Sequence, residues 1–186
     1  QGDALSPAFF ALALHRALQE AESRLEPGEA LIAFLDDVYL VTGPARAYDA
    51  FEVVRSAIHD HAEIQTHLGK CRCWNNAGGT APPRIQELGP DVWRGDRPPA
   101  ERGVVVLGSP VGTPEFVAAH AQKRMAQERS LLGQIEQVPD LQCAWLLLSM
   151  CAAARANHLL RSVPPSAVTG YARNHDEAIW TTLQSL

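Results

Sequence analysis

Two adjacent aspartates, Asp36 and Asp37, are the residues whose type and spacing point most directly to chemistry. They lie between apolar runs at 31–35 and 38–41, a pattern that predicts two short hairpin strands with the acids at or near the turn. Carboxylates held close to buried strands repel each other and lose solvation, and a bound divalent cation relieves both penalties. Mg²⁺ is the expected ion, because it prefers hard oxygen ligands and accepts a site completed by phosphates and water. The alternative is a solvated turn that happens to hold two acids.

The first residues of the chain carry a second signal. Ser6 is a good N-cap and Pro7 fits the first helical position, so we expect a helix that runs to about Leu25. Gly2, just ahead of this helix, allows the backbone to come close to a ligand. The alternative is an ordinary capped helix, which does not explain the Gln-Gly-Asp turn that precedes it.

Together the two segments resemble the palm of reverse transcriptases. The Gln-Gly-x-x-x-Ser-Pro turn at 1–7 is similar to motif B of that family, and Phe-x-Asp-Asp at 34–37 is similar to motif C. The pattern is most similar to the non-LTR retrotransposon (LINE-type) enzymes, and group II intron proteins share much of it. Two shorter matches follow in the expected order. The segment 64–71, with Lys70, resembles motif D, and 104–108 resembles motif E, the hairpin that grips the primer end.

The resemblance implies an RNA-directed DNA polymerase, which transfers a nucleotide from a dNTP to a primer 3′ hydroxyl on an RNA template. Two Mg²⁺ (or Mn²⁺) ions activate the hydroxyl and stabilise the leaving pyrophosphate. By resemblance, Asp36 is the direct metal ligand and Asp37 supports or joins it. Lys70 donates a proton to the pyrophosphate or offsets its charge, and the alternative is a plain surface lysine. The remaining implied contacts are Gln1, Gly2, Ser6, Pro7 and Phe34 in the nucleotide and template pocket, and Leu107 and Gly108 in the primer grip.

One part of the family's metal site lies outside this sequence. Reverse transcriptases take another aspartate from motif A, upstream of motif B, and use a basic fingers region upstream of that. We therefore expect a fragment, from motif B through the thumb, that is inactive alone. The formal net charge of −5 suits phosphate binding poorly, and it fits either missing basic fingers or a decayed copy. The alternative function is a catalytically dead palm relic that serves as a nucleic-acid or protein interaction module.

The expected fold class is α+β, in two domains. Residues 1–112 form a partial right-hand polymerase palm, a small antiparallel sheet packed by helices, with a loop or insertion near 75–102. Residues 113–186 form a helical thumb-like region. Strands at 63–66 and 70–74 are expected to complete the palm sheet, and 104–107 returns as a strand. Helices are expected at about 45–61, from an N-cap at Thr113 to about 137, from a cap at Asp140 to about 160, and after Pro164, with a break near Gly170 or Asn174.

Cysteine and histidine usage suggests both a compartment and a third hypothesis. The four cysteines form no Cys-x-x-Cys pair and no signal peptide is present, which favours a reducing location in the nucleus or cytoplasm. His59-x-His61, His67 and Cys71-x-Cys73 could make a zinc-binding helical module, although their spacing matches no standard finger.

Two features of the C-terminal half remain. The apolar stretch 141–154 is too short to span a membrane, so we expect no membrane association and a buried helix with Trp145 in the core. Lys123, Arg124 and Arg129 share one predicted helix. They either touch the primer-template backbone or form a solvated, mixed-charge face with the interspersed acids Glu115, Glu128 and Glu136.

Overall fold

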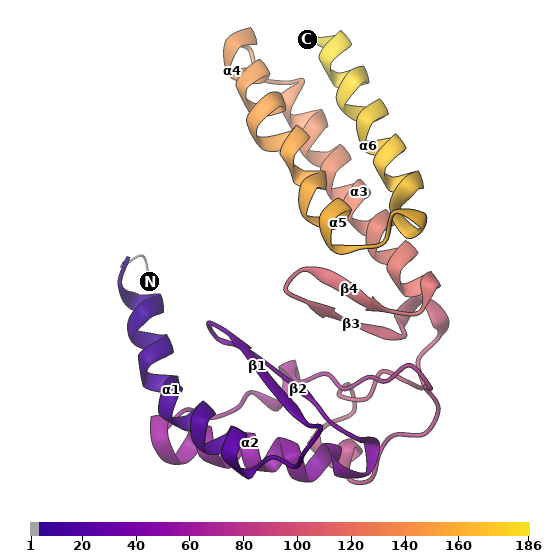
Figure 1. Cartoon of the computed structure of the whole chain (residues 1–186). Coiled ribbons are helices and arrows are strands. Elements are labelled where there is room, and N and C mark those ends of the chain that lie inside the picture. Colours follow the sequence, from indigo (N-terminus) through magenta and orange to yellow (C-terminus); the bar gives the residue numbers. More distant parts are fainter. Residues whose placement is uncertain (1–3) are drawn as a thin grey trace. The chain divides into compact units, whose positions relative to one another are not determined.

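A computed structural model describes residues 4–186, so Gln1 and Gly2 lie outside the described residues. The chain is a mixed α+β protein, mostly helical, with two small antiparallel sheets (Figure 1). This confirms the α+β class, whereas the polymerase palm stays a prediction. The chain forms two compact units. The first runs to Cys73 and takes in Gly79–Trp93, and the second comprises Trp74–Gly78 and Arg94–Leu186.

The first unit is built on two helices and a hairpin. α1 (Ser6–Arg24) packs on α2 (Ala47–Ala62), and the hairpin of β1 (Ala30–Phe34) and β2 (Asp37–Val41) lies on them. The short helix η1 (Pro44–Arg46) leads into α2. These elements confirm the predicted hairpin and the helix at 45–61. Their shared core consists of Leu14, Ala17, Ala21, Val54, Ala57 and Ile58, against which Leu31, Val38 and Leu40 of the hairpin pack.

The start of α1 differs from the prediction by one residue. Ser6 is the first helical residue and the cap is Leu5, which already has helical φ and ψ of −93° and −14°. The Leu5 carbonyl accepts the Phe9 amide at 3.0 Å, so the helical pattern begins one residue before the serine hydroxyl could cap it. The prediction that Ser6 is the N-cap is therefore wrong, and Pro7, expected at the first helical position, is the second helical residue.

The predicted strands at 63–66 and 70–74 do not form. Glu63 ends α2 in the left-handed conformation (φ 54°), the residues after it are irregular, and Leu68–Lys70 form the 3₁₀ helix η2. The only ladder contact in this segment of the described chain is a single parallel bridge between Cys73 and Trp93. Local apolar runs do not make strands without a partner to complete the hydrogen-bond ladder. The side chains of Leu68, Cys71 and Cys73 instead pack against a loop cluster of Ala47, Ile85, Leu88, Val92 and Trp93, which includes η3 (Ile85–Leu88).

The second unit joins a hairpin to a helical bundle. After η4 (Pro99–Glu101), strands β3 (Gly103–Val106) and β4 (Ser109–Gly112) pair antiparallel. α3 (Pro114–Ile135) then begins at Thr113, whose hydroxyl accepts the Phe116 amide at 3.2 Å, so the predicted cap is confirmed. The strand at 104–107 is likewise confirmed in position. The long irregular stretch near 75–102 holds only short 3₁₀ turns, as expected.

The remaining helices begin at α4 (Leu141–Leu146), which Asp140 caps by accepting the Cys143 amide at 2.7 Å. A π-helical segment, η5 (Leu147–Ala152), and a 3₁₀ segment, η6 (Ala153–Ala156), continue it into α5 (Asn157–Ser162). α6 (Pro165–Ser185) is continuous, so the predicted break near Gly170 or Asn174 is wrong. A single glycine inside a helix costs only about 1 kcal/mol, which packing of the buried face of α6 offsets.

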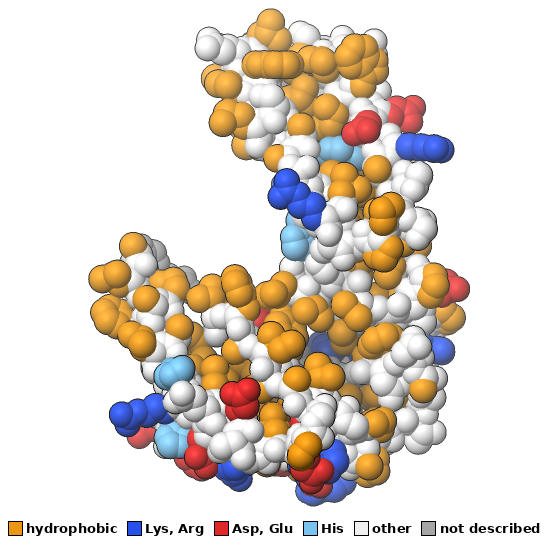
Figure 2. All heavy atoms as spheres, viewed as in Figure 1, with side chains coloured by type: hydrophobic (Ala, Val, Ile, Leu, Met, Phe, Trp, Pro, Cys, Tyr) orange, Lys and Arg blue, Asp and Glu red, His pale blue; other side chains and the backbone are white. Residues whose placement is uncertain are grey.

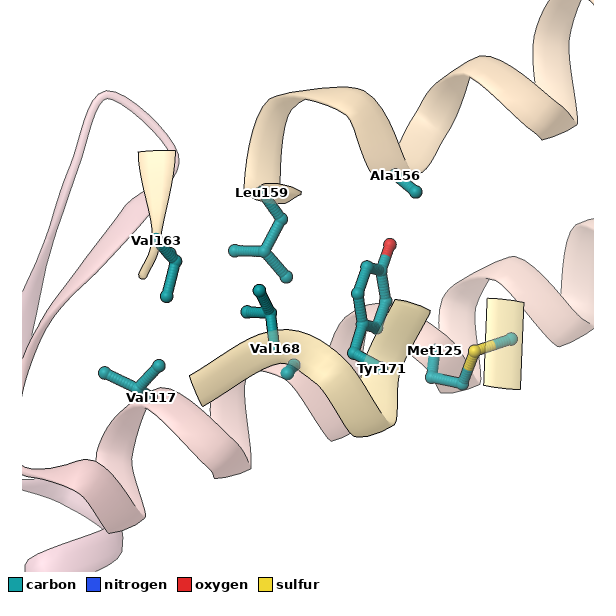
Figure 3. Packing of buried hydrophobic residues seen from close by; sticks show 8 residues of the cluster. Val117, Met125, Ala156, Leu159, Val163, Val168 and Tyr171 are labelled. Atoms are coloured by element: carbon teal, nitrogen blue, oxygen red, sulfur yellow. The ribbon is translucent and has the colours of Figure 1, made fainter. Parts of the chain in front are cut away.

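The bundle core is formed by α3, α5 and α6 (Figure 3). Figure 3 shows Leu159 and Val163 approaching Val168 and Tyr171 of α6, with Val117 and Met125 contributed by α3. A second cluster continues the core toward the other end of these helices with Leu132, Ile135, Ala144, Leu148 and Ala152.

The apolar stretch 141–154 is buried along one face only, and most of its residues are exposed. Leu148 and Ala152 are buried, but Trp145 is 49% exposed and Met150 is 72% exposed. The prediction of a buried helix with Trp145 in the core is therefore wrong, because only one face of the stretch meets α3 and α6. Figure 2 shows hydrophobic side chains gathered at the end of the bundle where α4 begins. The full helical run, Leu141–Ser162, is long and apolar enough to cross a membrane by length and composition, with a mean hydropathy of 1.2.

Candidate functional site

The hairpin of the first unit presents the acidic pair at its tip. Phe34 and Asp37 are the last paired residues of β1 and β2, so Leu35 and Asp36 make a two-residue turn between them. Leu35 has a φ of 53°, the left-handed region that a leucine rarely adopts. The turn therefore forms without the Asn-Gly or Asp-Gly chemistry usual for tight hairpins.

The two faces of this hairpin differ sharply in burial. Val38 and Leu40 face the helices, so Asp37 points to the opposite face, since successive side chains of a strand point to opposite faces. Across the ladder from Asp37 lies Phe34, which is 56% exposed. Asp36 and Asp37 are themselves exposed, so our expectation that burial deprives them of solvation is wrong. Both carboxylates are available to a ligand at the tip, beside an exposed aromatic ring.

The base of the hairpin is held by a buried carboxylate. Glu29, just before β1, accepts the Thr42 hydroxyl at 2.6 Å and the Glu26 amide at 2.8 Å. Arg46 Nε lies 3.5 Å from Glu29 Oε1 and 3.1 Å from Glu26 Oε1. Burial raises the pKa of Glu29, but these hydrogen bonds and the Arg46 charge outweigh it and hold that pKa below its ordinary 4.5. This cluster fixes the two ends of the hairpin to the start of α2.

The other residues implied by motif B are reached only in part. Ser6 and Pro7 form the exposed first turn of α1. Gln1 and Gly2 lie outside the described residues, so their predicted contacts with nucleotide and template stay predictions.

Lys70 occupies a different setting from the one expected. It is exposed and ends the 3₁₀ turn η2, so the prediction that this lysine follows a strand is wrong. Its neighbours Leu68 and Cys71 pack on the loop cluster around Trp93, whereas the hairpin packs on the α1–α2 core. The segment that carries Lys70 and the hairpin that carries the two aspartates therefore pack on separate clusters of the same unit.

Leu107 and Gly108 form the two-residue turn between β3 and β4, in the second unit. Both have positive φ, 48° and 83°, as a type I′ turn requires. The Leu107 side chain is 43% exposed. The structural role expected of Gly108 as a turn residue is confirmed, and a contact with the primer stays a prediction.

The three cations of α3 do not share one environment. Lys123 and Arg129 are exposed, while Arg124 is half-buried and donates to the Arg155 carbonyl at 3.5 Å. Two shallow hollows along α3 and α6, each of about 390 Å³, are lined in common by Arg129 and Asn174. Of these three side chains, only Lys123 and Arg129 are exposed enough to contact a phosphate backbone.

A buried polar cluster escaped the sequence analysis. Glu128 is 2% exposed, accepts a hydrogen bond from the Tyr171 hydroxyl and lies 2.9 Å from His175 Nδ1. His175 Nε2 lies 3.3 Å from the carbonyl of Ala153, where the π-helical segment gives way to the 3₁₀ segment. His175 therefore reaches the backbone where the hydrogen-bond pattern of the helical run changes. The sequence does indicate that Glu128 is buried, because Glu128 occupies a position in the apolar stripe of α3. That stripe consists of Val117, Ala121, Met125, Leu132 and Ile135.

Metal donors in the described part of the chain are limited to pairs. Within residues 4–186 no three His, Cys, Asp or Glu side chains come together as a metal site. Asp36 and Asp37 fit a shared divalent cation in donor chemistry, since both are exposed carboxylates next to each other. They would need further oxygen ligands from elsewhere. The zinc hypothesis on His59, His61, His67, Cys71 and Cys73 stays a prediction.

Comparison with protein-family models, curated proteins and solved structures found no match. The functional argument therefore rests on the residues and their geometry.

Proposed function

We propose that this chain is a fragment of a retroelement reverse transcriptase, most similar to the LINE type. In the parent protein it would add nucleotides from dNTPs to a DNA primer on an RNA template. The observation that carries this proposal is the hairpin tip, where Asp36 and Asp37 stand exposed beside Phe34 after a two-residue turn. The motif order along the chain, Gln-Gly-x-x-x-Ser-Pro before Phe-x-Asp-Asp, supports the same reading.

In phosphoryl transfer of this kind, the residues of the chain mainly bind and position the metal ions and the substrate. Asp36 and Asp37 would hold Mg²⁺ or Mn²⁺, which supplies charge stabilisation for the in-line phosphoryl transfer. Phe34 offers a flat apolar surface next to these acids for a base or sugar of the bound nucleotide. Lys70 would act on the pyrophosphate only if the parent protein brings it to the tip, because here its neighbours Leu68 and Cys71 pack with another cluster.

The proposal also assigns a compartment. All four cysteines are free, which fits a reducing location such as the nucleus or cytoplasm.

Metal binding at the tip is the first experiment. Free Mn²⁺ is measured by electron paramagnetic resonance as the 186-residue chain is titrated. We expect weak binding that Asp36→Asn or Asp37→Asn reduces severalfold, while Asp60→Asn, an exposed aspartate of α2, leaves it unchanged. Equal binding by all four proteins would remove the metal role of the pair.

Primer extension separates a polymerase from a relic. The isolated chain should not extend a DNA primer on an RNA template, and extension by it would overturn the fragment assignment. The parent protein should extend that primer, and Asp36→Asn should abolish extension. A parent protein that binds the RNA–DNA hybrid without extending the primer would instead support the interaction module.

A further inference from the structure

The tip of the β3–β4 hairpin is an unusual place for a leucine. A left-handed backbone costs an L-residue roughly 1–2 kcal/mol, and an exposed apolar side chain recovers little of that from packing. Leu107 nevertheless stands there with φ 48° and 43% exposure. The type I′ turn requires this positive φ, but it does not require an apolar side chain at the tip, where asparagine or glycine would carry less strain.

A histidine of α5 contacts the tip of this hairpin. His158 of α5 places Nε2 3.1 Å from the Ser109 hydroxyl, the residue that follows the turn. A Cβ atom on Gly108 would come 3.2 Å from the same nitrogen, a tight contact, and the φ of 83° favours glycine at this position. The imidazole thus lies directly against both residues that follow Leu107.

The side chain of His158 contributes little else to the fold. It is exposed, whereas its neighbour Leu159 is buried in the bundle core and anchors α5. Removal of the imidazole should therefore leave the core intact and release only the tip. This separates a positioning role from a general stabilising one.

The surroundings of the tip are cationic. His120 of α3 forms a hydrogen bond with the Gly108 backbone, and this bond by itself would raise the pKa of His120. Burial, followed by the charges of Arg124 and Lys123, lowers that pKa overall. Lys123 is exposed and close enough to act on His120, which itself contacts the tip, so a cation near this contact is available to the phosphates of a nucleic-acid strand.

We propose that His158 is a positioning residue that clamps the β3–β4 tip through Ser109, so that Leu107 is presented to the primer strand of an RNA–DNA hybrid. This rests on the proposed function in one respect only, the identity of the ligand. A fixed tip binds with less loss of conformational entropy than a mobile one, so the clamp should act on affinity.

Two measurements test the clamp on the 186-residue chain. Hydrogen exchange of the backbone amides at 106–109 reports the tip itself. Fluorescence anisotropy with a labelled RNA–DNA primer-template hybrid reports binding. His158→Ala should speed exchange about tenfold and weaken hybrid binding about three- to tenfold, the effect of one lost hydrogen bond. His158→Gln, which keeps a polar group able to reach Ser109, should recover most of both.

A double-mutant cycle distinguishes the clamp from loss of stability. Ser109→Ala and His158→Ala together should weaken binding no more than either alone, because they remove the same bond. Ser166→Ala and His61→Ala, exposed residues elsewhere, serve as matched controls. Additive losses, or unchanged exchange in His158→Ala, would overturn the clamp. Faster exchange with no hybrid binding by the wild type would keep the clamp and remove the nucleic-acid function.

Discussion

Glu128 and His175 face each other in the core of the second unit, with Oε2 of the glutamate 2.9 Å from Nδ1 of the histidine. The histidine's other nitrogen faces the Ala153 carbonyl, so both ring nitrogens meet oxygen acceptors. The pair joins α3 to α6 and ties both to the break in the helical run between α4 and α5.

Removal of one partner of this pair should be costly. Glu128→Ala leaves His175 and the Tyr171 hydroxyl without their acceptor in the core, and should lower the free energy of unfolding by about 3–5 kcal/mol. Glu128→Gln keeps an oxygen acceptor and should cost less. Urea denaturation followed by circular dichroism measures both. Glu115→Gln, in the exposed first turn of the same helix, should stay within about 0.5 kcal/mol, and a similar loss there would contradict the assignment.

The titration of Tyr171 gives an independent check of the same cluster. Burial, and after it the hydrogen bond to Glu128 and the charge of Glu128, raise the pKa of Tyr171 well above its ordinary 10. The folded state then holds a proton that the unfolded state releases. Stability from this group is therefore complete below pH 10 and falls as pH rises further. Phenolate absorbance at pH 10–11 should be the same in wild type and Tyr171→Phe, and a clear loss of amplitude in the variant would contradict this.

Local signals predicted the elements of this chain better than its long-range contacts. The hairpin at 30–41 and the caps at Thr113 and Asp140 depend on residues within a few positions of one another, and all three are confirmed. The strands at 63–66 and 70–74 failed because a strand needs a partner that the sequence does not specify. Glu128 was read as part of a solvated charged face, since its neighbours in sequence include Arg124 and Arg129. Its partners are 43 and 47 residues away.

In the candidate site, too, the sequence predicted the local element but not the long-range contacts. The apolar pattern around Asp36 and Asp37 located the hairpin, but it could not show which face the helices would cover. The exposure of Phe34 on the face shared with Asp37 depends on how α1 and α2 pack. The tie between His158 and Ser109 spans 49 residues and leaves no local pattern.

Acid should weaken the base of the first hairpin. The pKa of Glu29 is lowered in the folded state, so its contribution to stability is present above pH 4.5 and is lost as pH falls below that value through the folded pKa. Glu29→Gln should lose this acid dependence and be less stable than wild type at pH 7. Unfolding by urea between pH 3 and pH 7 measures both. Glu63→Gln, an exposed glutamate in the same unit, should keep the wild-type slope, and an unchanged slope in Glu29→Gln would contradict the assignment.

Glycine substitutions should separate close packing from helix propensity. A Cβ on Gly112 would meet the Arg102 carbonyl oxygen at 2.5 Å, so Gly112→Ala must displace β4 or the chain before β3 and should be clearly destabilising. A Cβ on Gly133, inside α3, would meet nothing within 4 Å. Gly133→Ala should therefore raise stability by up to about 1 kcal/mol through helix propensity. Melting temperatures of the two variants should move in opposite directions, and a shift in the same direction would contradict the packing of β4.

Both hairpin turns place a leucine with positive φ at their first position. Leu35 and Leu107 each occupy the first turn position with positive φ, 53° and 48°. Asparagine tolerates this conformation better, so Leu35→Asn and Leu107→Asn should each stabilise the chain by about 0.5–1 kcal/mol, measured by thermal melting. Hybrid binding should fall in Leu107→Asn although stability rises, because the apolar tip is removed. A gain in stability with unchanged binding would mean that Leu107 does not touch the primer.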